Sequence, residues 1–208
     1  MLPPDTLFLF FTASVLLALT PGPDNLFVLT QAAQGGRAAG FAVTLGLCTG
    51  LLVHTSAVAL GVAAIFQASA LAFSLLKYIG AAYLLYLAFL SFRAGIAGGG
   101  KASGESLGFW KLYLRGIIMN VTNPKVSLFF LAFLPQFTDP AIGSIVPQIL
   151  FLGFLFILST ILVFGLISLL AGTVGEWFQQ SEKAQTVLNR MAGVVFIGLA
   201  IKLVLIRR

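Results

Sequence analysis

Long apolar stretches separated by short polar connections make up most of this sequence. Six windows are each long enough, at roughly 20 residues, to cross a hydrocarbon core about 30 Å thick. They cover residues 5–33, 40–66, 70–92, 112–137, 143–171 and 187–206. The longest connection, residues 93–111, contains GGGKASGESLG, a Gly/Ser-rich stretch that favours a flexible loop. The pattern predicts an all-α membrane protein with six transmembrane helices, in which residues 1–208 form a single domain.

Proline-bearing motifs interrupt the first and the fourth of these windows. TPGPD occupies residues 20–24, and NPK occupies residues 123–125. Pro21, Pro23 and Pro124 lack a backbone donor and their rings clash with the preceding turn, so each helix must open there. In lipid the orphaned backbone groups would cost several kcal/mol each, so we expect both breaks to face protein or a watery cavity.

The two interrupted windows also belong to a weak internal repeat. TPGPDNLFVL (20–29) is matched by TNPKVSLFFL (122–131), and LLKYIGAAYLL (75–85) by LNRMAGVVFIG (188–198). The first repeat covers about residues 5–92 and the second about residues 112–206, joined by the 93–111 loop. Because each repeat has three helices, consecutive copies must lie upside down relative to each other, as in many secondary transporters. In such folds the substrate site lies near the midplane, at the broken helices.

Composition excludes several classes of function. Only 9% of the residues are charged, against about 25% in soluble domains. The single cysteine, Cys48, excludes an intramolecular disulfide, and one histidine with six scattered acidic residues gives no metal-ligand spacing. We therefore expect no metal, no cofactor and no enzymatic activity. The net charge of +6 comes from residues scattered singly in connections, which argues against nucleic-acid binding.

The placement of Lys and Arg bears on membrane orientation. They follow the first, third and fifth windows, at Arg37, Arg93, Lys101, Lys111, Lys183 and Arg190. By the positive-inside rule these connections are cytoplasmic and both termini are external. The C-terminal Lys202, Arg207 and Arg208 argue for the reverse orientation, so the choice stays open.

The polar residues at the breaks are candidates for function. Asp24 is placed to N-cap the second half of its helix, yet a neutral Asn or Ser would cap equally well without the cost of burying a charge. Lys125, beside the second break, is either a structural partner of Asp24 or a ligand. An ammonium opposite a carboxylate, with amides and carbonyls freed at the half-helix ends, complements a zwitterionic amino acid.

His54 has two interpretations. Imidazole titrates near neutral pH and could relay protons; a histidine bonded to a neighbouring helix is equally consistent with its position. The predicted substrate- and proton-binding residues are Asp24, Lys125, Asn25, Asn123, Thr20 and His54, and the helix-break residues are Pro21, Gly22, Pro23 and Pro124.

These motifs resemble the LysE/RhtB family of bacterial amino-acid exporters. The resemblance is carried by TPGPD, by GRAAGFAVTLGLCTGLLVH and KYIGAAYLLYLA, and by NPK followed by LFFLAFLPQF, and covers essentially the whole chain. It implies a multi-pass protein of the bacterial inner membrane that exports amino acids of the homoserine, threonine, leucine or lysine type, driven by the proton-motive force. The family pattern places its motif aspartate on Asp24 and its motif lysine on Lys125.

The leading hypothesis is therefore an alternating-access exporter of amino acids. Asp24 and nearby carbonyls would hold the substrate ammonium or exchange it for a proton, while Lys125 and half-helix amides would hold the carboxylate. The alternative is an ion or small-solute carrier of the same architecture, with Asp24 as the cation ligand. The expected partners are an amino acid, protons and the lipid bilayer; assembly as a homodimer stays open.

Overall fold

The computed structural model describes residues 2–20, 22–68, 70–93, 107–171 and 181–205. These residues are almost entirely helical, and none of them lies in a strand, so the predicted all-α class is confirmed. Their elements are α1 (Pro4–Leu19), α2 (Pro23–Ala68), α3 (Ala70–Arg93), α4 (Phe109–Val121), α5 (Pro124–Leu128), the π-helical turn η1 (Phe129–Phe133), the 3-10 turn η2 (Leu134–Phe137), α6 (Ile145–Leu170) and α8 (Glu182–Leu205). Pro21, Lys101 with most of the predicted Gly/Ser loop, Arg207 and Arg208 lie outside the described residues.

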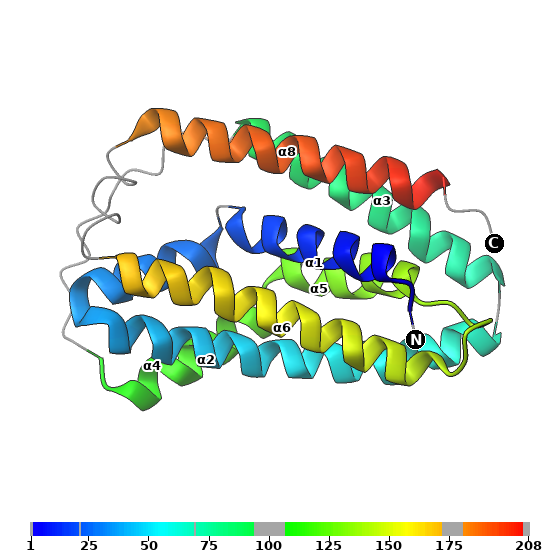
Figure 1. Ribbon diagram of the computed structural model, residues 1–208, viewed down its shortest axis with the longest axis horizontal. Coiled ribbons are helices and arrows are strands. Elements are labelled where there is room, and N and C mark those ends of the chain that lie inside the picture. Colours follow the sequence, from blue (N-terminus) through cyan, green and yellow to red (C-terminus); the bar gives the residue numbers. More distant parts are fainter. Residues whose placement is uncertain (1, 21, 69, 94–106, 172–180, 206–208) are drawn as a thin grey trace.

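Helix α2 consists of two limbs joined at Gly36. This residue has φ 77° and ψ 178°, a backbone conformation that is essentially restricted to glycine. Figure 1 shows the chain doubling back there, with residues 23–35 running away from α1 and residues 37–68 returning along the molecule. The first limb therefore continues the span that α1 begins, and the second limb is the second predicted helix.

Gly36→Ala is expected to lower the free energy of unfolding by about 1–3 kcal/mol, because alanine would be held in a strained conformation. No atom lies within 4 Å of the Cβ that alanine would add, so the loss comes from the backbone and not from a collision. Thermal unfolding of the detergent-purified protein measures it. Gly61→Ala, in the second limb and also with open space around it, is the matched control and is expected to show no loss. Equal losses in the two variants would contradict the prediction.

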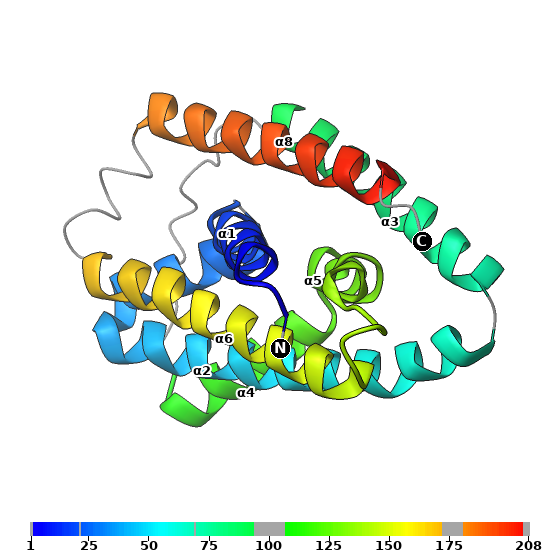
Figure 2. The same cartoon turned by 45° about the vertical axis from the view of Figure 1, so that its right-hand side comes forward.

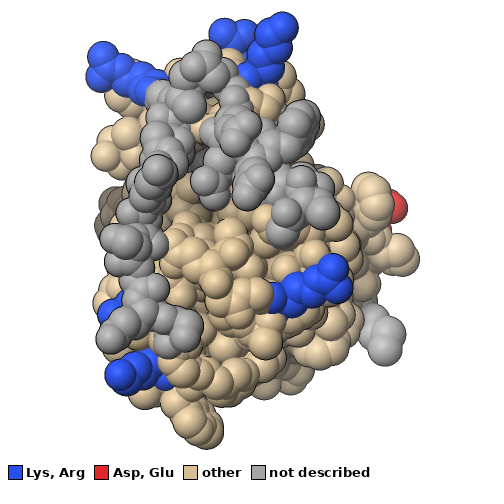
Figure 3. Space-filling model, turned by 90° about the vertical axis from the view of Figure 1, so that its left-hand side faces the viewer, with Lys and Arg blue, Asp and Glu red and all other residues tan. Residues whose placement is uncertain are grey.

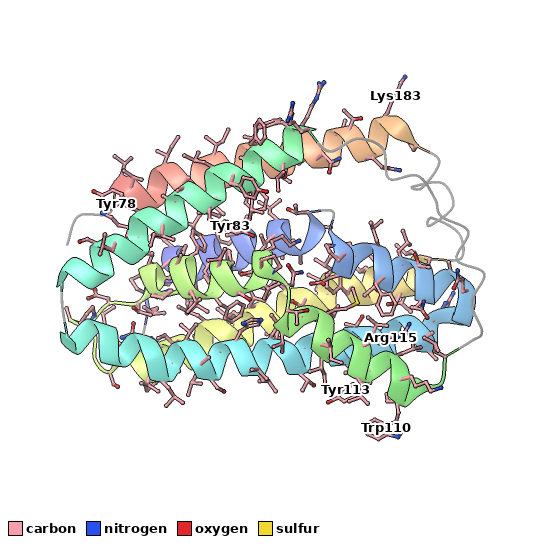
Figure 4. All side chains as sticks on the ribbon, turned by 180° about the vertical axis from the view of Figure 1, so that it is seen from behind. Tyr78, Tyr83, Trp110, Tyr113, Arg115 and Lys183 are labelled. Carbon is pink, nitrogen blue, oxygen red and sulfur yellow. The ribbon has the colours of Figure 1, made fainter. Side chains whose placement is uncertain are left out.

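The helices are arranged around a central pair. Figure 2 shows α1 and α5 nearly end-on and side by side, between the α3–α8 pair and the helices α2 and α6. Helix α2 packs against both α4 and α6, and α1 packs against α6 and α8. Tyr83 points from α3 toward the middle of the molecule, where it packs against the main core (Figure 4). The two broken spans thus lie in the interior, as their orphaned backbone groups require.

Corresponding helices of the two predicted repeats lie together. Helix α3 packs against α8 and α2 packs against α6, and in Figure 1 the members of each pair run in opposite directions. This arrangement is the one expected of two inverted three-helix copies. The repeat itself and the six complete spans stay predictions. By length and composition, the described residues contain two spanning helices, Pro23–Gly61 and Ile145–Leu170, or three if Phe109–Val121 and Pro124–Phe137, bent by 49°, form one span.

A cluster of phenylalanines fixes α5 and the helical turns that follow it. Phe129, Phe130 and Phe133 of η1 are almost completely buried. The Phe129 and Phe133 ring centroids are 4.7 Å apart, and Phe130 meets Phe156 of α6 edge-on at 5.1 Å. Each such pair contributes about 0.5–1.5 kcal/mol beyond its buried area. These residues therefore pack in the core and hold the start of α5, with Asn123 before it, in place.

Basic residues gather at one end of the molecule. Arg37, Arg93, Lys111 and Lys183 lie at helix ends beside the connections that Figure 3 faces, and Lys and Arg side chains are seen around that end. Trp110, 70% exposed, points outward from α4 near the same end, as expected of an interfacial aromatic residue (Figure 4). This clustering favours a cytoplasmic position for that end, the first of the two orientations considered.

Candidate functional site

Both predicted helix breaks are present, and they are built alike. α1 ends at Leu19 and α2 begins at Pro23, whereas α4 ends at Val121 and α5 begins at Pro124. Proline suits the first position of a helix because the N–H it lacks would have no partner there. The second position of each half-helix carries a charge, which is Asp24 in α2 and Lys125 in α5.

The prediction that Asp24 N-caps its half-helix is wrong. The helix already begins at Pro23, so Asp24 lies in the first turn, and the carbonyl of Gly22 accepts the first bond, from the Leu26 N–H at 3.1 Å. The reason is that proline, with φ held near −65°, takes the first helical position and shifts the cap to the residue before it. A carboxylate in the first turn still interacts favourably with the positive end of the helix dipole.

Asp24 is 3% exposed and uses only one of its carboxylate oxygens within the protein. Oδ2 accepts a hydrogen bond from Asn123 Nδ2 at 2.9 Å. Oδ1 is buried and has no hydrogen-bond partner among the residues that the structure describes. The carboxylate is therefore positioned by one oxygen and keeps the other for a further donor.

Asn123 joins the two breaks through the two ends of one amide. Its Oδ1 accepts from the Lys125 backbone N–H at 3.0 Å and so caps α5, while its Nδ2 donates to Asp24. The side chain is 5% exposed. A buried amide with both ends engaged holds the start of α5 and the start of α2 in one fixed relation.

Lys125 caps the end of α1. A cation at the N-terminus of α5 opposes the dipole of its own helix, and the side chain instead reaches across to the other break. Its Nζ donates to the carbonyls of Thr20, at 3.1 Å, and Leu17, at 3.4 Å. These carbonyls lie at the C-terminal end of α1, where the last turn has no intrahelical donors. Lys125 thus ties the start of α5 to the end of α1.

Asp24 and Lys125 interact electrostatically, but not as a direct ion pair. Within the described part of the chain, no nitrogen–oxygen contact of 4.0 Å or less joins them. Each is held by other groups, and Asn123 connects them. The prediction that Lys125 binds the substrate carboxylate is not tested by these contacts; they do show that two of the three ammonium donors are engaged by backbone carbonyls.

Asn25 and Thr20 complete the first break. Asn25 Nδ2 donates to the Ala18 carbonyl at 2.5 Å, and its Oδ1 is buried without a hydrogen-bond partner in the described part of the chain. Thr20 Oγ1 donates to the Leu16 carbonyl of its own helix at 2.8 Å, so Thr20 contributes through its backbone carbonyl and not through its hydroxyl. We expected the break to leave carbonyls near the end of α1 without helical partners. Side-chain donors from Asn25 and Lys125 bond to these carbonyls instead.

Gly22 allows these side chains to approach the backbone. A Cβ at this position would lie 3.2 Å from Lys125 Nζ and 3.9 Å from Asn25 Oδ1. A larger residue would press on the lysine end and displace it from the α1 carbonyls. The glycine of the TPGPD motif therefore gives room for the close approach of Lys125 to this break.

His54 lies next to the second break. Its Nε2 is 3.1 Å from the Asn120 carbonyl, which also accepts from the Asn123 N–H at 3.0 Å, and its ring packs 5.6 Å from Phe130. Of the two interpretations, the structure shows a histidine bonded to a neighbouring helix. In the described part of the chain no contact joins His54 to Asp24, and a role in proton relay is not tested.

Asn120 was not predicted and belongs to this region. It is 2% exposed, its Oδ1 is buried without a protein partner, and it packs against Gly50, where a Cβ would lie 2.6 Å from Asn120 Cβ. A polar residue inside an apolar run, one turn before NPK, was the signal that could have identified it. Across the described residues, no group of three or more His, Cys, Asp or Glu side chains is placed to hold a metal ion.

Comparison with known proteins identifies the family. The family model of the LysE type translocator matches residues 15–207. This chain belongs to the LysE family. A LysE relative, the homoserine/homoserine lactone efflux protein of Salmonella typhimurium, is 33% identical over 190 residues that cover 91% of each chain. The leucine efflux protein of Salmonella choleraesuis is 27% identical over 195 residues, covering 93% of this chain and 92% of that one.

An uncharacterised membrane protein of Pseudomonas aeruginosa is 33% identical over 198 residues, which cover 91% of this chain and 90% of the relative. No solved structure matches the chain. LysE membership confirms the resemblance drawn from TPGPD and NPK. It also confirms the prediction that the protein is a membrane transporter and not an enzyme. In this LysE protein both motifs meet at the two helix breaks, although neither the family match nor the relatives assign a role to any one residue.

Proposed function

We propose that this LysE protein is a secondary active exporter of amino acids in the bacterial inner membrane, driven by the proton-motive force and working by alternating access. The named relatives export homoserine, homoserine lactone and leucine, so amino acids of the homoserine, threonine, leucine or lysine type are the substrate class. The observation that carries the proposal is the meeting of two broken helices around Asp24, whose Oδ1 stays buried without a donor.

Asp24 would serve both the substrate and the proton. A buried carboxylate that lacks a direct ion-pair partner is costly, and a bound ammonium or a bound proton removes most of that cost. Since the two ligands compete for the same oxygen, loading one displaces the other. Exchange of a substrate ammonium for a proton at Asp24 would couple export to the proton gradient.

The architecture supports alternating access. Helices α1 and α5 lie in the middle of the molecule. Lys125 of α5 holds the end of α1, and Asn123, which caps α5, holds Asp24 at the start of α2. A half-helix can tilt about its break without disrupting the other half. Rocking of one repeat against the other would then expose Asp24 to each side of the membrane in turn.

Efflux from intact cells tests the proposed function. Cells that express this chain are preloaded by dipeptide feeding with a panel of amino acids, and loss of each is followed against an empty vector. Faster loss of one chemical group of amino acids is expected, and a protonophore should abolish it. If every amino acid leaves at the control rate while the protein is verified in the membrane, the proposal fails.

The alternative remains an ion or small-solute carrier in which Asp24 Oδ1 is the cation ligand. It predicts that the same cells show no selective loss of amino acids and that metal ions or other cations change their transport rate instead. Measuring both sets of fluxes in one strain therefore separates the two functions.

A further inference from the structure

We infer that the site recognises its substrate by the α-ammonium group, through Asp24 and Asn25, and does not require a free carboxylate. The substrate class then extends from amino acids to their amides, esters and lactones, which keep the primary amine. This inference rests on the proposed export function and specifies which part of the substrate the site recognises.

The first observation is a pair of buried acceptor oxygens on consecutive residues. Asp24 is 3% exposed and Asn25 is 9% exposed, and the Oδ1 of each is buried without a hydrogen-bond donor from any residue that the structure describes. The orientation of the Asn25 amide follows from its partner, because only the nitrogen can donate to the Ala18 carbonyl. The free end of Asn25 is therefore an acceptor, as is the free end of Asp24.

The second observation is that each side-chain nitrogen near these oxygens already donates to another group. Asn123 Nδ2 donates to Asp24 Oδ2, Asn25 Nδ2 donates to the Ala18 carbonyl, and the Lys125 ammonium donates to Thr20 and Leu17. Among the described side chains at the first break, the two buried atoms without a hydrogen-bond partner, Asp24 Oδ1 and Asn25 Oδ1, are both acceptors. A ligand that supplies several N–H donors and no acceptor corrects that imbalance, and an alkylammonium group has three.

The third observation concerns the position of Lys125. Its Nζ and Asn25 Oδ1 both face Gly22, at 3.2 Å and 3.9 Å from the position of an added Cβ. A carboxylate brought to this lysine would have to displace its bonds to the end of α1 and would lie near the Asn25 oxygen, which repels it. The ammonium of the substrate meets no such competition, so binding depends on the amine more strongly than on the carboxylate.

Competition in membrane vesicles tests the inference with the wild-type, full-length protein. Inside-out vesicles take up labelled leucine or labelled homoserine, and unlabelled analogues are added as competitors. Leucinamide, leucine methyl ester and homoserine lactone alter the carboxyl group only. N-acetyl-leucine and the 2-hydroxy acid that replaces the amine of leucine by a hydroxyl alter the amine only.

The carboxyl-modified analogues are expected to compete nearly as well as their parent amino acids. The amine-modified analogues are expected to be weaker by roughly 100-fold or more, because they leave buried polar groups of the site unpaired. Equal competition by the 2-hydroxy acid, or failure of leucinamide and homoserine lactone to compete, overturns the inference. Absence of uptake of labelled homoserine, threonine, leucine and lysine alike overturns the proposed function, which is a different result from uptake with the wrong selectivity.

Asn25→Ala provides a second readout. Loss of one hydrogen bond to a charged group should raise KM by about tenfold or more, equally for leucine and for leucinamide. Asn189→Ala, which removes a buried asparagine of α8, is the control and should leave KM unchanged. If Asn25 only supports the end of α1, its replacement lowers the amount of protein in the vesicles while KM stays at the wild-type value, and the assignment of Asn25 is overturned.

Discussion

Export is expected to fall to the empty-vector rate, about tenfold or more below wild type, when Asp24 is replaced by asparagine. Asparagine has nearly the same shape, and its Oδ1 can still accept the bond from Asn123 Nδ2. It carries no negative charge, so it neither attracts a substrate ammonium nor exchanges a proton. The measurement is efflux of the best substrate from preloaded cells, normalised to the amount of protein in the membrane.

Two further variants show whether Asp24 acts on the substrate or only balances the charge of the half-buried Lys125. Asp139→Asn changes an exposed aspartate in the connection before α6 and should leave export at the wild-type rate. The double variant Asp24→Asn/Lys125→Met removes both charges at the helix breaks. If the two residues were merely a structural pair, the double variant would regain export, because an uncompensated buried charge is the main penalty of a single replacement. Regained export would exclude Asp24 from the mechanism.

Lys125→Met is expected to reduce both the stability of the protein and its export. Methionine has a similar length and no donors, so the Thr20 and Leu17 carbonyls lose their bonds from Nζ. Hydrogen bonds to charged groups contribute about 1.5–3 kcal/mol each. The end of α1 would then lose its hydrogen bonds to the side chain at the start of α5. Export should fall by about tenfold or more, since a misplacement near 1 Å can cost roughly 100-fold in rate.

The loss is measured as the apparent melting temperature of the detergent-purified protein together with efflux from cells. Lys111→Met replaces an exposed lysine in the first turn of α4 and is the matched control, with no expected change in either quantity. A Lys125→Met protein that melts and exports as the wild type does would show that the contacts with the α1 carbonyls contribute nothing measurable to the fold or to transport.

The sequence was most informative where its signals are local. The apolar windows predicted the helices, because a backbone in lipid has few alternatives to helical hydrogen bonding. Proline predicted both helix breaks, because its missing N–H and its ring disrupt the helix at the residues next to it. Both breaks lie where TPGPD and NPK predicted them. The same local rules misplaced one detail. Pro23 takes the first helical position, so Asp24 lies in the first turn and not at the cap.

The sequence did not predict the contacts between the two halves of the chain. Nothing in NPK indicates that Asn123 bonds to Asp24, or that Lys125 reaches the carbonyls of Thr20 and Leu17 more than a hundred residues earlier. Side-chain partners at such separations depend on how helices pack, which a linear pattern does not encode. Asn120 was not predicted as a site residue for the same reason, because its burial depends on the space that Gly50 leaves on a neighbouring helix.

By itself, the sequence determined an all-α membrane transporter with two broken helices and an acidic and a basic residue beside the breaks. Only the tertiary structure decided how those residues are used: Lys125 is bound to the end of α1, Asn123 joins the two breaks, and Asp24 and Asn25 each keep one buried acceptor. The physical reason is that proline and apolar periodicity act within a turn or a helix. A hydrogen bond across the bundle exists only once packing brings its donor and acceptor together.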